Sequence, residues 1–168
     1  LVNQLAAQRG LASGTTPPAL LKTVADIRRD SQVPIVLYIY YNLMHQYGLK
    51  EFMSDAKAAG VDGMLALDLP PEEADEYAGL MHETELSSIW LVAPTTPEAR
   101  MKSIVQNGSG FIYYISREGV TGMQQEVSNS IGDKISDIRK HTELPIAVGF
   151  GISNPEQARQ VANCADAV

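Results

Sequence analysis

Two glycine-bearing segments in the second half of the sequence hold the residues best suited to binding chemistry. The first is the apolar run Phe111–Ser116, which leads into the polar loop Arg117–Gly122 with its two glycines. The second is Pro145–Ser153, where another apolar run ends at Gly149 and Gly151. Glycines let backbone N–H groups approach an anion closely, and loops at the carboxyl ends of parallel strands form binding sites. The pair therefore predicts an anion site built largely from backbone amides.

These segments belong to a regular alternation of expected strands and helices. Short apolar runs, which are typical of strands covered on both faces, occupy residues 34–41, 61–67, 87–93, 111–116 and 145–149, with another beginning near 165. Helices are expected at 3–13, 17–30, 49–59, 71–83, 97–107, 128–141 and 154–163. Strand starts that recur every ~25–35 residues indicate repeated βα units and a parallel sheet.

Local signals predict where several helices begin. Thr16 precedes a proline pair and Thr96 precedes Pro97, so each threonine is expected to cap a helix whose first turn contains proline. Ser153 or Asn154 is expected to cap the last helix in the same way.

The order of these features separates two parallel-sheet folds. An open doubly wound sheet carries its glycine-rich turn after the first strand, whereas a (β/α)8 TIM barrel binds phosphate after its late strands. The glycine loops of this sequence come late, which favours the barrel. A barrel needs ~250 residues, so residues 1–168 are expected to form a single-domain fragment with about strands 3 to 8. Both ends of the sequence look cut, and unpaired sheet edges would favour association with a partner or aggregation.

The composition limits the class of partner. The net charge is −7, which argues against nucleic acid or an anionic membrane as the main partner but permits a phosphorylated small substrate. The single cysteine, Cys164, excludes an internal disulfide framework and fits a reducing compartment. Three scattered histidines and the lack of a CxxC motif make a structural zinc site an unfavoured interpretation. No metal and no membrane span are expected.

An ordered set of five motifs resembles one enzyme family. The motifs are Tyr40-Tyr-Asn42 with Gly48, Ala59–Gly63 leading to Asp68-Leu-Pro70, Ala93-Pro-Thr-Thr96, Ser116–Gly122 and Gly149–Ser153. Together they resemble the α subunit of tryptophan synthase over essentially the whole sequence. The resemblance implies a (β/α)8 barrel and a lyase of tryptophan biosynthesis, which cleaves indole-3-glycerol phosphate by a retro-aldol reaction to indole and glyceraldehyde 3-phosphate. It also implies a cytoplasmic enzyme with no cofactor of its own, in a heterotetramer with a pyridoxal-phosphate-dependent β subunit.

The resemblance also implies a set of substrate-binding residues. Tyr113 and Phe150 would line the indole pocket, while the loop Ser116–Gly122 would close over the substrate, with Thr121 helping to hold it shut. Gly122 and Gly151 would lie near the phosphate. The full set is Tyr40, Leu65, Leu91, Tyr113, Thr121, Gly122, Phe150 and Gly151. Plain core packing explains the leucines equally well.

Three further residues are expected to serve communication with the partner rather than chemistry. Asn42 and Pro70 resemble positions at the β-subunit interface, and Asp68 resembles a supporting residue near it. A capping role for Asp68 toward residues 71–73 is an alternative. The reaction needs a carboxyl group that protonates the indole ring and a carboxylate that takes the glycerol hydroxyl proton. Neither is matched in this sequence, and both are expected upstream of Leu1.

Two other hypotheses remain open from the sequence. One is a different phosphate-binding barrel enzyme of amino-acid biosynthesis, such as an isomerase of the histidine pathway. The other is a non-catalytic barrel that binds and activates a partner.

Overall fold

One parallel sheet organises the chain, and its strands follow one another in sequence order. In the computed structural model, which describes residues 2–116, 127–149 and 151–168, the sheet has five strands. They are β1 (Val36–Ile39), β2 (Gly63–Ala66), β3 (Ser87–Val92), β4 (Ile112–Ile115) and β5 (Ile146–Gly149). Beyond β5, the strand expected near residue 165 consists of a parallel bridge between Ala147 and Ala167.

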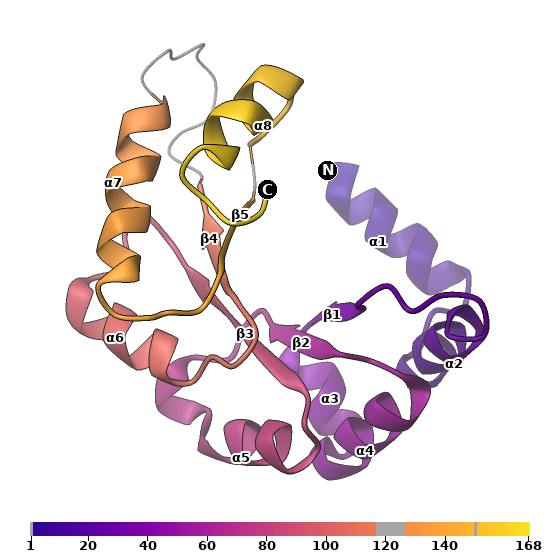
Figure 1. Ribbon diagram of the computed structural model, residues 1–168. Helices are drawn as coiled ribbons and strands as arrows, with labels where there is room; N and C mark the ends of the chain where they lie inside the picture. The colour runs from indigo at the N-terminus through magenta and orange to yellow at the C-terminus, as the bar shows by residue number, and fades with distance from the viewer. Residues whose placement is uncertain (1, 117–126, 150) are drawn as a thin grey trace.

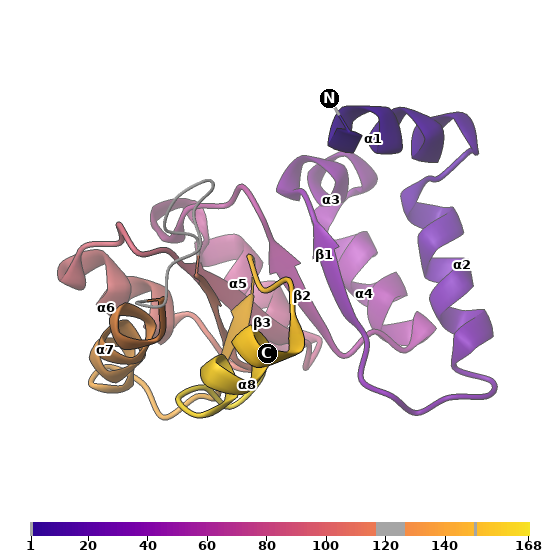
Figure 2. The ribbon, with the colours of Figure 1, turned by 90° about the horizontal axis from the view of Figure 1, so that it is seen from above.

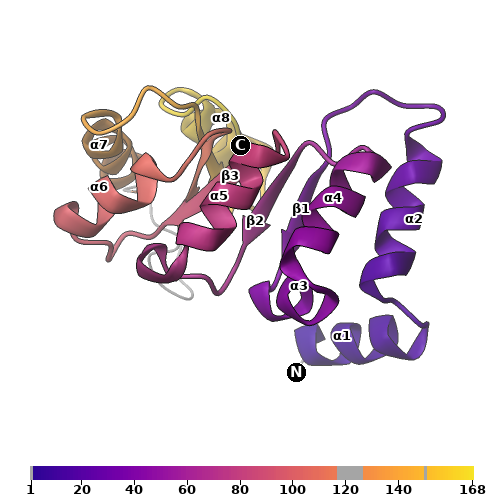
Figure 3. The ribbon, with the colours of Figure 1, turned by 90° about the horizontal axis from the view of Figure 1, so that it is seen from below.

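Helices alternate with the strands, and most of them lie along the outer side of the curved sheet (Figure 1). They are α1 (Val2–Ala12), α2 (Pro17–Ile27), α3 (Tyr41–Tyr47), α4 (Leu49–Ala59), α5 (Asp75–Glu83), α6 (Glu98–Gln106), α7 (Val127–Arg139) and α8 (Pro155–Ala162), with a short 3-10 helix η1 at Pro71–Glu73. Helix α1 lies across the ends of α2 and α3, as two opposite views show (Figures 2 and 3). This βα order confirms the α/β fold class that the sequence predicts.

The two faces of the sheet have different surroundings because side chains alternate along each strand. Residues that point toward the helices form the buried core, among them Leu37, Met64, Val92, Ile112 and Val148. The intervening residues point to the concave inner face. Parallel pairing aligns them across the sheet, with Tyr38 beside Leu65, and Leu91 beside Tyr113, which is itself beside Ala147.

The structure differs from the strand expected at residues 34–41 and contains a helix before residue 49 that was not expected. The strand ends at Ile39, and a helix that the sequence pattern did not indicate, α3, begins at Tyr41. A distant side chain explains this early start, since Asp68 Oδ1 accepts a hydrogen bond of 2.6 Å from the Tyr41 N–H. Gly48, with a φ of 100°, then separates α3 from α4.

Two other helix starts also differ from expectation. Residues 71–83 do not form one helix, because η1 ends at Glu73 and α5 begins at Asp75. Helix α6 begins at Glu98, and Thr96 does not cap it: Thr96 Oγ1 accepts a hydrogen bond from the Ala93 N–H at 3.0 Å and closes the preceding loop instead.

A carboxylate joins the amino ends of β1 and β2. Asp62 Oδ2 accepts a 2.6 Å hydrogen bond from the Ile35 N–H and pairs with the guanidinium of Arg28. Arg28 also donates to the carbonyl of Gly60 at 2.7 Å. The end of α2 is thereby fastened to the start of two strands.

The same arrangement recurs at the other edge of the sheet. Asp166 Oδ2 accepts a 2.8 Å hydrogen bond from the Ile146 N–H and pairs with Arg139 at 2.8 Å. The neighbouring N–H and the guanidinium hold the pKa of the Asp166 carboxyl below its usual value. The two sites thus form a repeated clamp. In each, an aspartate at the start of one strand accepts from an N–H at the start of the neighbouring strand and pairs with an arginine near the end of the helix that precedes that neighbouring strand.

Candidate functional site

The carboxyl ends of β4 and β5 meet through a tyrosine and a glycine. Ile115 pairs with Gly149, and the ring of Tyr113 lies over that glycine: a Cβ built at Gly149 would be 1.8 Å from the Tyr113 hydroxyl oxygen. Ser116 Oγ and the Ser116 N–H both donate to the Gly149 carbonyl, each at 2.9 Å. The two strand ends predicted to converge therefore do so, and Gly149 gives the tyrosine its space.

Tyr40 and Tyr113 approach the same part of the inner face. Burial raises the pKa of Tyr38, a residue of β1, and the phenol groups of Tyr113 and Tyr40 raise it further. Tyr40 is 57% exposed and stands immediately before α3. The structure thus brings these two predicted site residues to one face.

Leu65 and Leu91 also lie on the inner face. Leu65 is buried beside Tyr38 and Ile89, whereas Leu91 is half-buried, is paired with Tyr113 and lines a cavity. Both leucines therefore point away from the helix-packed core. Whether they contact a substrate stays a prediction.

Gly151 begins the turn that leads into α8. Its φ of +78° favours glycine, although a Cβ there would meet nothing within 4 Å, so conformation rather than crowding requires glycine. The Asn154 side chain accepts a 2.9 Å hydrogen bond from the Gln157 N–H, and Gln157 Oε1 accepts one of 2.9 Å from the Ser153 N–H. Asn154 is therefore the helix cap, and Ser153 is bound by the reciprocal contact. The predicted residues Thr121, Gly122 and Phe150 lie outside the described residues.

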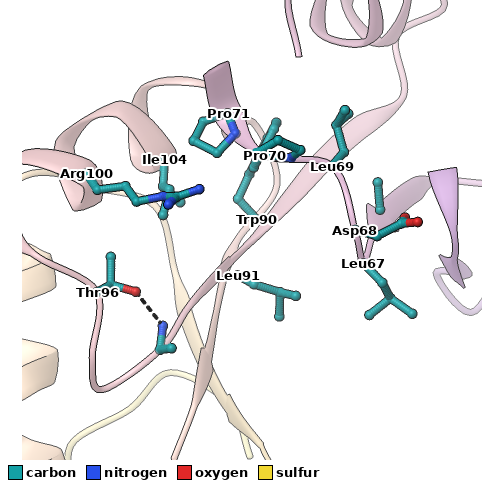
Figure 4. A pocket seen from close by; sticks show the side chains of 12 residues that line it. Leu67, Asp68, Leu69, Pro70, Pro71, Trp90, Leu91, Thr96, Arg100 and Ile104 are labelled. Carbon is teal, nitrogen blue, oxygen red and sulfur yellow. Dashed lines mark hydrogen bonds between the residues drawn. The ribbon is translucent and has the colours of Figure 1, made fainter. Parts of the chain in front are cut away.

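A cavity of about 410 Å³ opens at the carboxyl ends of β2 and β3 (Figure 4). Its wall combines the strand ends with η1 and the first turns of α6. It is lined by Ala66, Leu67, Asp68, Leu69, Pro70, Pro71, Trp90, Leu91, Ala93, Thr96, Arg100 and Ile104. Three predicted residues, Asp68, Pro70 and Leu91, are therefore brought together at one hollow of a size suited to a small molecule.

Asp68 links this cavity to α3. Its carboxylate accepts from the Tyr41 N–H, whereas the N-cap position of η1 is occupied by Pro70. The capping hypothesis toward residues 71–73 is therefore wrong, and Asp68 caps a helix 27 residues earlier in the chain instead. Asn42 follows Tyr41 in α3 and is exposed, so Asn42 and Asp68 belong to one corner of the molecule.

Sequence reasoning missed one charged pair at the cavity. Arg100 of α6 pairs with Glu72 of η1 at 3.2 Å. An arginine in the first turn of a helix lies against the positive end of the helix dipole, which is unfavourable. That position was the available signal that Arg100 has a specific partner. Within the described residues, no group of three or more histidine, cysteine, aspartate or glutamate side chains could hold a metal ion.

No helix in the described part of the chain is both long and apolar enough to cross a membrane.

Comparison with known proteins assigns this geometry to a family. The family model described as tryptophan synthase alpha chain matches residues 2–168. The tryptophan synthase alpha chain of Opitutus terrae is 53% identical over 168 residues, covering 100% of this chain and 63% of that protein. That of Geotalea daltonii is 48% identical over 165 residues, covering 98% of this chain and 62% of that protein.

Solved structures agree with the sequence relatives. Tryptophan synthase subunit alpha from Campylobacter jejuni superposes with a TM-score of 0.88 at 34% identity, covering 97% of this chain and 65% of that one. A chain of the tryptophan synthase a2b2 complex from Pyrococcus furiosus also has a TM-score of 0.88 at 34% identity, covering 98% and 67%. The sheet of this chain is thus part of a TIM barrel, and neither alternative hypothesis is favoured. The chain, which spans about 63% of the length of the curated relatives it matches, belongs to the tryptophan synthase alpha chain family.

Proposed function

We propose that the whole protein is a carbon–carbon lyase of tryptophan biosynthesis that cleaves indole-3-glycerol phosphate to indole and glyceraldehyde 3-phosphate. The observation that carries the proposal is the match of the family over residues 2–168 together with the meeting of Tyr113 and Gly149 at adjacent strand ends. A cytoplasmic location is proposed with it.

Substrate binding would divide between rings and backbone amides. The phenol of Tyr113, held over Gly149, offers a flat apolar surface for indole, and Phe150 would complete that surface. The Gly151 N–H, in a conformation that glycine adopts readily, would donate to the phosphate with that of Gly122. Tyr40, Leu65 and Leu91 would line the pocket, and Thr121 would hold the loop closed.

The reaction breaks the bond between indole C3 and the adjacent glycerol carbon. One carboxyl group protonates the ring at C3, and one carboxylate removes the proton of the glycerol hydroxyl as the aldehyde forms. We assign neither role to Asp68, whose oxygen is engaged by the Tyr41 N–H. No residue of this chain is proposed as catalytic, and no metal or cofactor of its own is proposed.

The partner would be a tryptophan synthase β subunit, a pyridoxal-phosphate enzyme. The Pyrococcus furiosus relative is part of an a2b2 complex, and a heterotetramer is therefore proposed here as well. Asn42, Asp68 and Pro70 lie near one corner of this chain and are the proposed contact and communication residues.

The test is an assay of the whole protein with indole-3-glycerol phosphate, in which indole and glyceraldehyde 3-phosphate are both quantified. Equal amounts of the two products are expected, at a higher rate when the β subunit is added. No indole with or without the β subunit would reject the proposal. The 168-residue chain is the matched control and is expected to release no indole.

A further inference from the structure

The cavity between η1 and α6 has a chemistry that differs from a backbone-amide phosphate site. Its walls near α6 are apolar, with Trp90, Ile104 and Pro71 all buried, and one guanidinium, that of Arg100, extends among them (Figure 4). We propose that this cavity, which adjoins the proposed substrate pocket at Leu91, is a second small-molecule site, for an aromatic carboxylate, with Arg100 as the residue that binds the carboxylate. The proposal does not depend on the proposed lyase function.

Arg100 is available to such a ligand because its present partner holds it weakly. The Arg100 and Glu72 side chains are 48% and 59% exposed and meet at a single distance of 3.2 Å. Exposed pairs of this kind contribute little to stability. A ligand carboxylate can accept two parallel hydrogen bonds from a guanidinium, which is the stronger arrangement. The ligand can therefore replace Glu72 at little cost.

The apolar wall is rigid enough to favour a flat ring. Trp90 Nε1 donates to Ser88 Oγ at 2.7 Å and to the Asn107 carbonyl at 2.9 Å, and the Trp90 ring meets Tyr77 edge to face at 6.3 Å. A fixed tryptophan ring loses little conformational entropy when a ligand binds against it. The cavity volume of about 410 Å³ lies within the usual range for small-molecule sites.

The charged residues of the cavity predict the orientation of the ligand. Asp68 and Arg100 are the charged residues that line the cavity, and they come from different walls. An anionic group near Asp68 would be repelled, so the carboxylate is expected at Arg100 and an uncharged ring elsewhere. A ligand with one negative charge fits this distribution better than a dianionic phosphate.

Titration calorimetry of the protein with 2-naphthoate tests the proposal, with the neutral 2-naphthamide as the matched ligand. Arg100→Gln should weaken naphthoate binding about tenfold and leave naphthamide binding unchanged. Glu72→Gln removes the competing carboxylate and should tighten naphthoate binding by about two- to fivefold. Trp90 is the single tryptophan of the 168-residue sequence, and its indole N–H resonance should shift as naphthoate binds.

Several results would overturn the proposal. The first is that the wild-type protein does not bind naphthoate. The second is that Arg100→Gln binds naphthoate with the same affinity as the wild type. The third is that naphthoate binds without a shift of the Trp90 resonance. Displacement of naphthoate by indole-3-glycerol phosphate from the whole protein would assign the ligand to the substrate site and would also overturn it. The Glu72→Gln variant keeps the test informative should Arg100→Gln fold poorly, because unchanged naphthoate affinity in Glu72→Gln would contradict the exchange of partners.

Discussion

The two ends of the sheet use aspartate in opposite ways. At the amino ends, Asp62 and Asp166 each accept from an N–H at the start of a neighbouring strand and pair with an arginine near the end of the helix that precedes that neighbouring strand. At the carboxyl end, Asp68 accepts from the Tyr41 N–H, lines a cavity and lies exposed.

This contrast indicates that the amino ends of the strands stabilise the sheet, whereas the carboxyl ends form the candidate site. In both clamps an arginine neutralises the charge of the carboxylate, and the pair stabilises the sheet. The Asp68 carboxylate lines a cavity and accepts from a backbone N–H. This division agrees with the general rule for barrels, in which the amino-end face serves stability and the carboxyl-end face serves function. Substitutions at the two ends should therefore separate stability from binding.

The largest loss of stability is expected at Gly149, where the Tyr113 ring occupies the position that a side chain would take. Gly149→Ala would place a methyl group 1.8 Å from the Tyr113 hydroxyl oxygen and 2.4 Å from Cζ, so the ring must move. We expect a loss of about 3 kcal/mol in the free energy of unfolding, measured in urea. The double variant Tyr113→Ala/Gly149→Ala should be more stable than Gly149→Ala alone. Equal stability of the two would contradict the packing described.

The two amino-end clamps should differ in strength. Asp62→Ala leaves Arg28, which is 15% exposed, without its carboxylate, and should cost about 2 kcal/mol. Asp166→Ala leaves Arg139, which is 43% exposed and so better hydrated, and should cost about 1 kcal/mol. Urea unfolding measures both, and Asp26→Ala, in an exposed pair, is the control with a cost below about 0.5 kcal/mol. A larger loss of stability in Asp166→Ala than in Asp62→Ala would contradict the expectation that the clamp with the more buried arginine contributes more.

Asp68 should matter less for stability than either clamp. Asp68→Ala removes the acceptor for the Tyr41 N–H and should cost about 1 kcal/mol or less, as for loss of a helix cap. Asp68→Asn keeps an acceptor oxygen and should unfold almost as the wild type does. A cost above about 2 kcal/mol for Asp68→Ala would show that this end of the sheet is also a scaffold.

The smallest expected effect is the dependence of stability on pH in the acidic range. The pKa of Asp166 is lowered by the Ile146 N–H and by Arg139. A lowered pKa in the folded state means that the stabilisation is present above about pH 4 and is lost as the pH falls toward the folded-state pKa. The difference in unfolding free energy between wild type and Asp166→Asn should therefore shrink between about pH 6 and pH 3. A difference that does not change with pH would contradict a contribution from the charged clamp.

Local signals predicted much of the scaffold. The βα order, the Thr16 cap and the cap at Asn154 follow from residues close in sequence, and the structure confirms them. The convergence of the ends of β4 and β5 was also predictable, because both are apolar runs that end in polar or glycine-bearing segments, and parallel strand ends meet at one edge.

Long-range contacts account for what the sequence did not indicate. Helix α3 begins at Tyr41 because Asp68, 27 residues later, accepts its N–H, and no local pattern encodes that contact. The Arg100–Glu72 pair likewise joins residues 28 positions apart. Thr96 resembles a cap in sequence, but the loop after β3 turns back and presents the Ala93 N–H to it instead.

The central claim is that the inner face at the ends of β4 and β5 binds substrate, and two adjacent tyrosines test it most directly. Tyr113 points to the inner face, whereas Tyr114 is buried on the helix side of the same strand. In the whole protein, Tyr113→Ala should lower kcat/KM for indole release from indole-3-glycerol phosphate by about tenfold or more. Tyr114→Phe should leave kcat/KM within about twofold of the wild type. An unchanged kcat/KM in Tyr113→Ala would contradict the account.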